Sequence, residues 1–262
     1  MLLENKTAVI YGAGGNVGGA VARAFAGEGA RVFLAGRTRS SLEAVAGEIA
    51  DAGGTAEAAE VDALDERAVD EHADDIAARA GGIDVSFNSI GHGDVHGLRL
   101  LDMPFEDFWR PIAAAVRSQF LTTRAAARHM ILRGSGVVLA ITASTARHTI
   151  PNVGGTGVAF DAIESQCRQW ACELGRRGVR VAWLQTSGVS DAISRTVERF
   201  PDYGLGSMRR DELISWLEGK SMLGRLTTLA DVGAVAAFVA SDRAAAITGT
   251  GVDLTCGSIG GR

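Results

Sequence analysis

Lysine and tyrosine are nearly absent from this sequence of 262 residues: the lysines are Lys6 and Lys220, and the tyrosines are Tyr11 and Tyr203. Four residues after the two tyrosines stand Gly15 and Ser207. A Tyr-x-x-x-Lys pair therefore cannot exist anywhere in the chain. Chemistry that depends on a phenol with an ammonium one helical turn away is excluded.

Cysteine is also scarce, and its pattern argues against a disulfide framework. The chain has three cysteines (Cys167, Cys172 and Cys256), an odd number with no Cys-x-x-Cys spacing. No secretory signal pattern precedes them, so we expect a reduced compartment, the cytoplasm. No apolar run reaches the roughly 18 residues that a membrane-spanning helix needs, so we expect no membrane association.

The charge balance disfavours polyanionic partners. The formal net charge is −5, which does not suit binding to nucleic acid or to an anionic membrane. Apolar residues make up 47% of the chain, enough for a large core. This length fits one α/β domain over residues 1–262, and a small-molecule substrate or effector is the expected ligand.

Short apolar runs alternate with longer segments of helical period. The predicted strands cover residues 7–12, 31–36, 55–62, 82–89, 136–142, 178–185 and 251–255, and the predicted helices cover 17–29, 40–52, 66–80, 104–132, 158–177 and 229–240. This alternation predicts right-handed βαβ crossovers and a doubly wound parallel sheet with helices on both faces. The least regular stretch, residues 186–226, follows a strand and is predicted to be a lid over ligand. Its Phe200, Tyr203, Met208, Trp216 and Met222 suggest a partly apolar pocket.

A glycine-rich turn lies between the first predicted strand and helix. It reads Gly12-Ala13-Gly14-Gly15-Asn16-Val17-Gly18-Gly19. Gly12 permits a sharp exit from the strand, Gly14 and Gly15 let the backbone approach a diphosphate, and Gly18 lets helix and strand pack closely. The helix N-terminus would then face the phosphates with N–H groups and partial positive charge. The turn predicts a dinucleotide-binding site.

The end of the second strand favours NADP over NAD. It reads Gly36-Arg37-Thr38-Arg39 and has no acid to bind both ribose hydroxyls. Arg37 could instead bind a 2′-phosphate through its guanidinium fork. Asp62 is predicted to meet the adenine. Completing the predicted cofactor set are Thr38, Ala63, Asn88, Gly91 and Thr142.

Several motifs together resemble the short-chain dehydrogenase/reductase family, near its 3-oxoacyl-carrier-protein reductase branch. They are the glycine turn at 12–18, Asp62, Asn88-Ser89-Ile90-Gly91, the phrase from Phe120 to Ala126, Gly178-Val179-Arg180-Val181, Gly224-Arg225-Leu226 and Ile247-Thr248-Gly249. The resemblance implies a seven-stranded Rossmann-type sheet in the order 3-2-1-4-5-6-7. It implies a homotetramer or homodimer through the helices at 104–132 and 158–177, and it places Val189 where the family's backbone holds the nicotinamide carboxamide.

The same resemblance implies a catalytic tetrad of Asn, Ser, Tyr and Lys, and this chain has replaced all four. The corresponding positions are Ala115, Ala143, Thr156 and Phe160. The Pro-Gly that the family places along the nicotinamide is Thr186-Ser187. Losing a positioned general acid costs roughly 10²–10⁴ in rate.

Other polar residues are candidates for the missing proton donor. Ser144, Thr156 and His148 are expected at the same crevice, with His148 able to titrate near neutral pH. His92, Asp94 and His96 have a spacing that could suggest a metal, but no fourth ligand is evident, so no metal is predicted and a solvated loop is expected. Asp161 and Glu164 are predicted to be helix-surface charges.

Three functions remain open at this stage. The first is an NADP(H)-dependent oxidoreductase on a carbonyl or alcohol, with a non-standard proton donor. The second is a catalytically silent NADP(H)-binding protein, or a partner subunit of an active relative. The third is a non-redox enzyme such as a lyase, which fits less well because the cofactor motifs are retained.

Overall fold

The computed structural model describes residues 1–146, 151–193 and 210–258. Its centre is a parallel sheet of seven strands in the order β3-β2-β1-β4-β5-β6-β7, which confirms the predicted topology. The strands are β1 (Thr7–Tyr11), β2 (Arg31–Gly36), β3 (Thr55–Glu60), β4 (Val85–Asn88), β5 (Gly136–Ala143), β6 (Val179–Thr186) and β7 (Gly251–Leu254). The strand order changes direction between β1 and β4. Open α/β sheets bind ligands at such a switch point.

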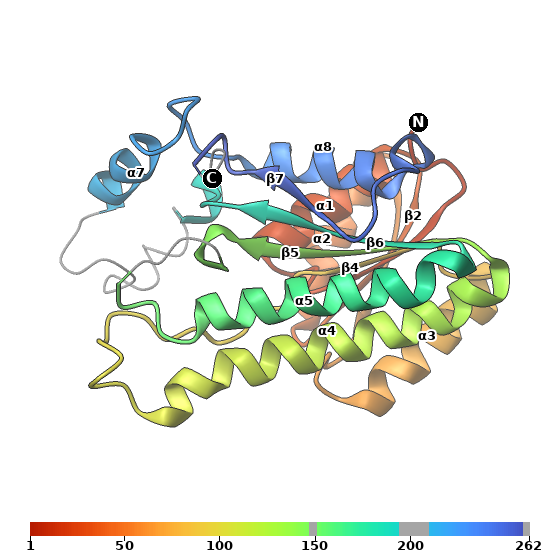
Figure 1. Cartoon of the computed structure of the whole chain (residues 1–262). Coiled ribbons are helices and arrows are strands. Elements are labelled where there is room, and N and C mark those ends of the chain that lie inside the picture. Colours follow the sequence, from red (N-terminus) through yellow and green to blue (C-terminus); the bar gives the residue numbers. More distant parts are fainter. Residues whose placement is uncertain (147–150, 194–209, 259–262) are drawn as a thin grey trace.

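Helices cover both faces of this sheet (Figure 1). One face carries α1 (Asn16–Gly27), α2 (Arg39–Asp51) and α8 (Leu229–Ala240), and the other carries α3 (Glu66–Ala80), α4 (Phe105–Arg133) and α5 (Thr156–Leu174). Strand side chains alternate between the two layers: Ile10 packs with the first group, and Val9 and Tyr11 pack with the second. Burial on both faces explains why the strands read as nearly continuous apolar runs.

The register of the sheet brings the ends of four strands level. Tyr11 at the end of β1 lies opposite Ala35 of β2 and Asn88 of β4, and Ala35 lies opposite Ala59 of β3. The turns that follow these strands therefore meet at one edge. No helix within the described ranges is long and apolar enough to cross a membrane.

The structure differs from the predicted elements mainly after β6. A helix, α7 (Arg210–Glu218), lies inside the stretch predicted to be irregular. The sequence does contain a pattern that predicts this helix, since Leu213, Trp216 and Leu217 have the i, i+3, i+4 spacing of a helix face. Residues 194–209 of the predicted lid, including Phe200, Tyr203 and Met208, lie outside the described residues. The predicted helix at 158–177 begins earlier, at Thr156, and ends in a 3₁₀ turn over Gly175–Arg177.

Candidate functional site

The glycine turn after β1 is tightly closed. Gly12 has a φ of +82°, a conformation that favours glycine, and its N–H donates to the carbonyl of Ala35 at 2.8 Å. Gly15 N–H donates back to the Gly12 carbonyl at 3.0 Å. A Cβ on Gly18 would overlap that same carbonyl oxygen and would lie 2.7 Å from the Ser89 hydroxyl. The turn and the first residues of α1 therefore need glycine at both positions.

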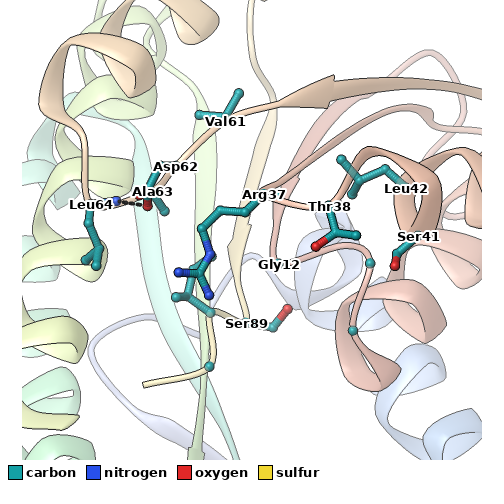
Figure 2. Close-up of a pocket in the computed structure, with 15 residues that line it drawn as sticks. Gly12, Arg37, Thr38, Ser41, Leu42, Val61, Asp62, Ala63, Leu64 and Ser89 are labelled. Carbon is teal, nitrogen blue, oxygen red and sulfur yellow. Dashed lines mark hydrogen bonds between the residues drawn. The ribbon is translucent and has the colours of Figure 1, made fainter. Parts of the chain in front are cut away.

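A cavity of about 460 Å³ opens beside this turn, at the edge where β1, β2, β3 and β4 end (Figure 2). Eight of the predicted cofactor-binding residues line it: Gly12, Gly14, Gly15, Arg37, Thr38, Asp62, Ala63 and Gly91. Gly36, Ser89 and Ile90, which belong to the same motifs, line it as well, together with residues that the motifs did not single out: Ser41, Leu42, Val61 and Leu64. The turns after four separate strands thus form one cavity.

Arg37 extends across this cavity between Asp62 and Gly12 (Figure 2). In the described part of the chain, no hydrogen bond or ion pair holds its guanidinium elsewhere. Thr38 and Ser41 place hydroxyl groups on the side of the glycine turn (Figure 2). Asp62 uses one carboxylate oxygen to accept the N–H of Leu64 at 3.0 Å, which fixes its orientation.

The remaining predicted cofactor residues do not line the cavity. Asn16, Val17 and Gly18 form the start of α1. The Asn88 amide donates to Thr122 at 2.9 Å and accepts from the N–H of Ile90, so it fixes the turn after β4. Thr142 is buried and donates to Glu164, and Val189 is buried beyond β6, in a bridge to Thr227.

The helix ends at this cavity are electrostatically suited to an anion. No side chain caps α1 or α2, and neither helix has an acidic residue in its first turn. By contrast, Asp65 caps α3, and Thr228 and Asp231 form a capping box on α8. The partial positive charges of α1 and α2 are therefore not compensated by carboxylates of their own first turns.

A second cavity, of about 220 Å³, lies at the ends of β5 and β6. Three of the four tetrad-equivalent positions line it, namely Ala143, Thr156 and Phe160, and Ser144 lines it as well. The fourth position, Ala115, is buried in the core on α4. His148 lies outside the described residues. The side chains of Ile193, Leu213, Trp216 and Leu217 supply an apolar wall.

Thr156 is joined to the loop after β4 by two hydrogen bonds. Its hydroxyl donates to Asp94 Oδ1 at 2.9 Å, and His96 Nε2 lies 2.8 Å from Thr156 Oγ1. Asp94 and His96 both line the second cavity. The expectation that residues 92–96 form a solvated loop is wrong for His92, whereas Asp94 is exposed. His92 is 7% exposed and packs edge-on against Phe160, with 5.6 Å between ring centroids.

The two histidines of this loop are shifted toward their neutral forms. Burial lowers the pKa of His92 and of His96, and the Asp94 carboxylate opposes the change at both. The three side chains do not gather as metal ligands: no group of three His, Cys, Asp or Glu in the described ranges could hold a metal ion.

Glu164 is a buried carboxylate, which corrects the prediction that it is a helix-surface charge. It is 2% exposed, and its Oε1 accepts from Thr142 at 3.2 Å and from Gln185 at 3.0 Å. Arg168 lies 3.8 Å from its other oxygen. These contacts join α5 to β5 and β6 and so support the floor of the second cavity. Asp161, by contrast, is exposed as predicted.

Tyr11 is not placed to replace the missing phenol. It is fully buried at the end of β1, packed edge-on against His72, and its hydroxyl has no hydrogen-bond partner among the described residues. Burial raises the pKa of Tyr11 far above its ordinary value, and Asp70 raises it further. Tyr203 lies outside the described residues.

Comparisons with known proteins agree with this architecture. Residues 12–258 match the family model described as enoyl-(acyl carrier protein) reductase. An uncharacterised oxidoreductase of Bacillus subtilis (strain 168), YxbG, is 31% identical over 247 residues, covering 94% of this chain and 88% of that protein. The 7alpha-hydroxysteroid dehydrogenase of Escherichia coli (strain K12) is 30% identical over 196 residues, covering 74% and 76%.

A solved structure shows the same fold. The crystal structure of an NAD+-bound xylitol dehydrogenase superposes with a TM-score of 0.88 at 23% identity, covering 97% of this chain and 99% of that one. Together with the sheet order, the glycine turn and the family match, these relatives establish that the chain belongs to the short-chain dehydrogenase/reductase family of NAD(P)-binding oxidoreductases.

Proposed function

We propose that this protein is an NADP(H)-dependent oxidoreductase that interconverts a carbonyl compound and an alcohol without the family's tyrosine. The observation that carries the proposal is the 460 Å³ cavity, in which Arg37 stands where an NAD-specific site would need an acid. The chain retains the family's cofactor motifs but has replaced the family's proton donor, so the cofactor site and the proton donor are considered separately.

The residues of the cavity fit a dinucleotide phosphate. The diphosphate would lie at the glycine turn and the N-terminus of α1, where no carboxylate competes with it. The adenosine would lie between Arg37 and Asp62, and its 2′-phosphate would meet Arg37 and the uncapped start of α2. When bound, the nicotinamide supplies or accepts hydride.

The second cavity favours an uncharged substrate with an apolar body. Asp94 is its only charged lining residue among those described, and this carboxylate would repel an anion. Leu213, Trp216 and Leu217 offer apolar surface, whereas Ser144 and Thr156 offer hydroxyls to a carbonyl or alcohol oxygen.

One observation favours a second candidate, a catalytically silent NADP(H)-binding protein. Phe160 stands at the lysine position and packs against the buried His92, so an apolar contact replaces the ammonium. Titration with NADPH, followed by turnover assays on neutral ketones and alcohols, separates the two. Saturable binding with turnover supports the oxidoreductase, and saturable binding without turnover on any of them supports the silent protein. Absence of binding to both NADPH and NADH overturns both.

Arg37→Ala is expected to weaken NADPH binding by about 10- to 100-fold and to leave NADH binding unchanged. A charge-assisted hydrogen bond to a phosphate contributes about 1.5–3 kcal/mol of binding free energy. NADH lacks the 2′-phosphate that would accept this bond, so its binding does not depend on Arg37. Isothermal titration calorimetry with both nucleotides measures the effect. Arg39→Ala is the matched control, because Arg39 lies two residues on and pairs with Glu43 at the surface, at 2.7 Å. Equal losses for NADPH and NADH in Arg37→Ala would contradict the assignment.

We also propose that the chain forms a homodimer or homotetramer through α4 and α5, as the family resemblance implies. A stripe of exposed apolar side chains follows one face of α4: Phe105, Trp109, Val116 and Phe120. Val158 on α5 is also exposed, and Phe120 contacts Trp170 of α5 with 5.6 Å between ring centroids. A contiguous apolar stripe of this kind is typical of an interface.

A double variant of this stripe, Trp109→Glu with Phe120→Glu, is expected to be monomeric, because burying two carboxylates in the interface is unfavourable. Light scattering after size-exclusion chromatography measures the mass. Leu132→Glu is the control, since Leu132 is 82% exposed on the opposite face of α4. A double variant that keeps the mass of the unmodified protein would show that another surface mediates assembly.

A further inference from the structure

We infer that His96, joined through the Thr156 hydroxyl to Asp94, is the proton-exchanging group of this site and replaces the family's tyrosine. The inference rests on the proposed function for its hydride chemistry. The geometry that carries it is a hydrogen-bonded unit of three side chains whose members all line the second cavity.

The backbone fixes the two segments that carry these side chains. Gly97 N–H donates to the carbonyl of Asn152 at 2.8 Å, so the loop after β4 is tied to the segment before α5. Gly154 has a φ of +57°, and a Cβ on it would lie 2.9 Å from the carbonyl oxygen of Val95. A Cβ on Gly157 would lie 2.7 Å from the carbonyl oxygen of Thr145. The start of α5 is therefore held close to both neighbours, which places Thr156 firmly.

Hydrogen-bond direction follows from the atoms. The Thr156 hydroxyl has one hydrogen. When it donates this hydrogen to Asp94 Oδ1, its oxygen accepts from His96 Nε2–H; in the other tautomer of the neutral imidazole, Nε2 is unprotonated and the hydroxyl can donate to it instead. Asp94 thereby orients the hydroxyl and Thr156 links the imidazole to the cavity. A threonine hydroxyl does not titrate near neutral pH, but it can pass a proton between a substrate oxygen and an imidazole that does.

His96 is the suitable titrating member among the described residues. His92 and Asp94 are the titratable neighbours on its own loop. Among the described residues, the side chains of α5 and α7 that line this cavity are uncharged: Thr156, Phe160, Leu213, Trp216 and Leu217. Burial favours the neutral imidazole, and Asp94 favours the imidazolium. At neutral pH the imidazole of His96 is therefore neutral and can act as a base. When it accepts a proton, Asp94 stabilises the positive charge.

The proton balance for alcohol oxidation is complete. The alcohol O–H proton passes to Thr156 Oγ1 as the Thr156 hydroxyl proton passes to Nε2 of a neutral His96, in the tautomer that leaves this atom unprotonated, and a nicotinamide held beside the second cavity would accept the C–H hydride. The products are a ketone or aldehyde, the reduced nucleotide and an imidazolium that releases its proton to solvent. Carbonyl reduction runs the same transfers backward and begins from the imidazolium, so its rate is expected to fall as pH rises through the pKa of His96.

NMR of the full-length, nucleotide-free protein with ¹⁵N-labelled histidine tests the unit independently of turnover. Asp94→Asn is expected to move the titration of His96 to lower pH, because it removes the charge that stabilises the imidazolium. Thr156→Val is expected to change the ¹⁵N shift of His96 Nε2, and Thr156→Ser to restore it. His129, which pairs with Asp74 at 2.9 Å on another part of the molecule, is the internal reference.

Turnover provides the second measurement. His96→Gln is expected to lower kcat by about 100-fold or more while the Kd for NADPH stays unchanged. The inference is overturned if Asp94→Asn and Thr156→Val leave the His96 resonances unchanged, or if His96→Gln turns over as fast as the unmodified protein. Because the NMR measurement needs no nucleotide, loss of NADPH binding would overturn the proposed function separately.

Discussion

Replacing Gly18 with alanine is expected to abolish saturable NADPH binding and to lower the free energy of unfolding by about 2 kcal/mol. The added Cβ would overlap the carbonyl oxygen of Gly12 and approach the Ser89 hydroxyl at 2.7 Å. The Gly12 carbonyl is backbone, and the Ser89 hydroxyl donates to the carbonyl of Tyr11 at 3.1 Å, a bond that it would lose by moving aside. The turn must therefore open, which costs the overpacking energy of about 1–3 kcal/mol and displaces the amides that would face the diphosphate.

A second glycine of the same helix provides a matched control. Gly27 ends α1 at an exposed position, and a Cβ built there meets no atom within 4 Å. Gly27→Ala should therefore leave NADPH binding unchanged and raise stability slightly, by up to about 1 kcal/mol. Calorimetric titration and urea denaturation measure both quantities. If Gly18→Ala binds NADPH as tightly as Gly27→Ala does, the turn is not the phosphate site.

Acidification from pH 7.5 to pH 4.5 is expected to lower the free energy of unfolding by about 2–3 kcal/mol through His72 alone. Burial lowers the pKa of His72 from 6.5 to about 4, with Asp75 opposing and Arg79 adding to the shift. The unfolded chain therefore binds a proton on this imidazole before the folded protein does. The stabilisation is complete above pH 6.5 and is lost as pH falls toward 4.

The contribution of His72 is measured by comparing two variants. Denaturant unfolding of the unmodified protein and of His72→Gln at pH 7.5 and pH 4.5 gives the difference that belongs to this group. His129→Gln is the control, because His129 is only partly buried and pairs with Asp74 at 2.9 Å. The explanation fails if His72→Gln shows the same acid sensitivity as the unmodified protein.

The sheet and the cofactor cavity could be predicted because their signals are local in sequence. Most strands are short apolar runs, most cavity residues lie in the turns that follow strands, and parallel pairing brings those strand ends to one edge. Gly12, Arg37 and Asp62 are far apart along the chain, but their positions relative to their own strands suffice to bring them together.

The second cavity was less predictable because its contacts connect distant segments without a shared local pattern. Thr156 lies sixty-two residues after Asp94 and sixty after His96, and nothing in either segment specifies that they meet. Their union depends on Gly97 and Gly154, whose roles become apparent only from backbone geometry. The prediction that Glu164 is a helix-surface charge is wrong for a related reason. Its partners Thr142 and Gln185 come from two strands, and the helical pattern of the sequence does not reveal them.

A crystal structure of the protein grown with NADPH tests the central claim most directly. The account predicts the diphosphate against residues 12–18 and the adenosine 2′-phosphate within hydrogen-bond distance of Arg37, in the cavity that Asp62 and Ser89 also line. If that cavity is empty at saturating nucleotide, or if the nucleotide occupies another part of the molecule, the account is contradicted.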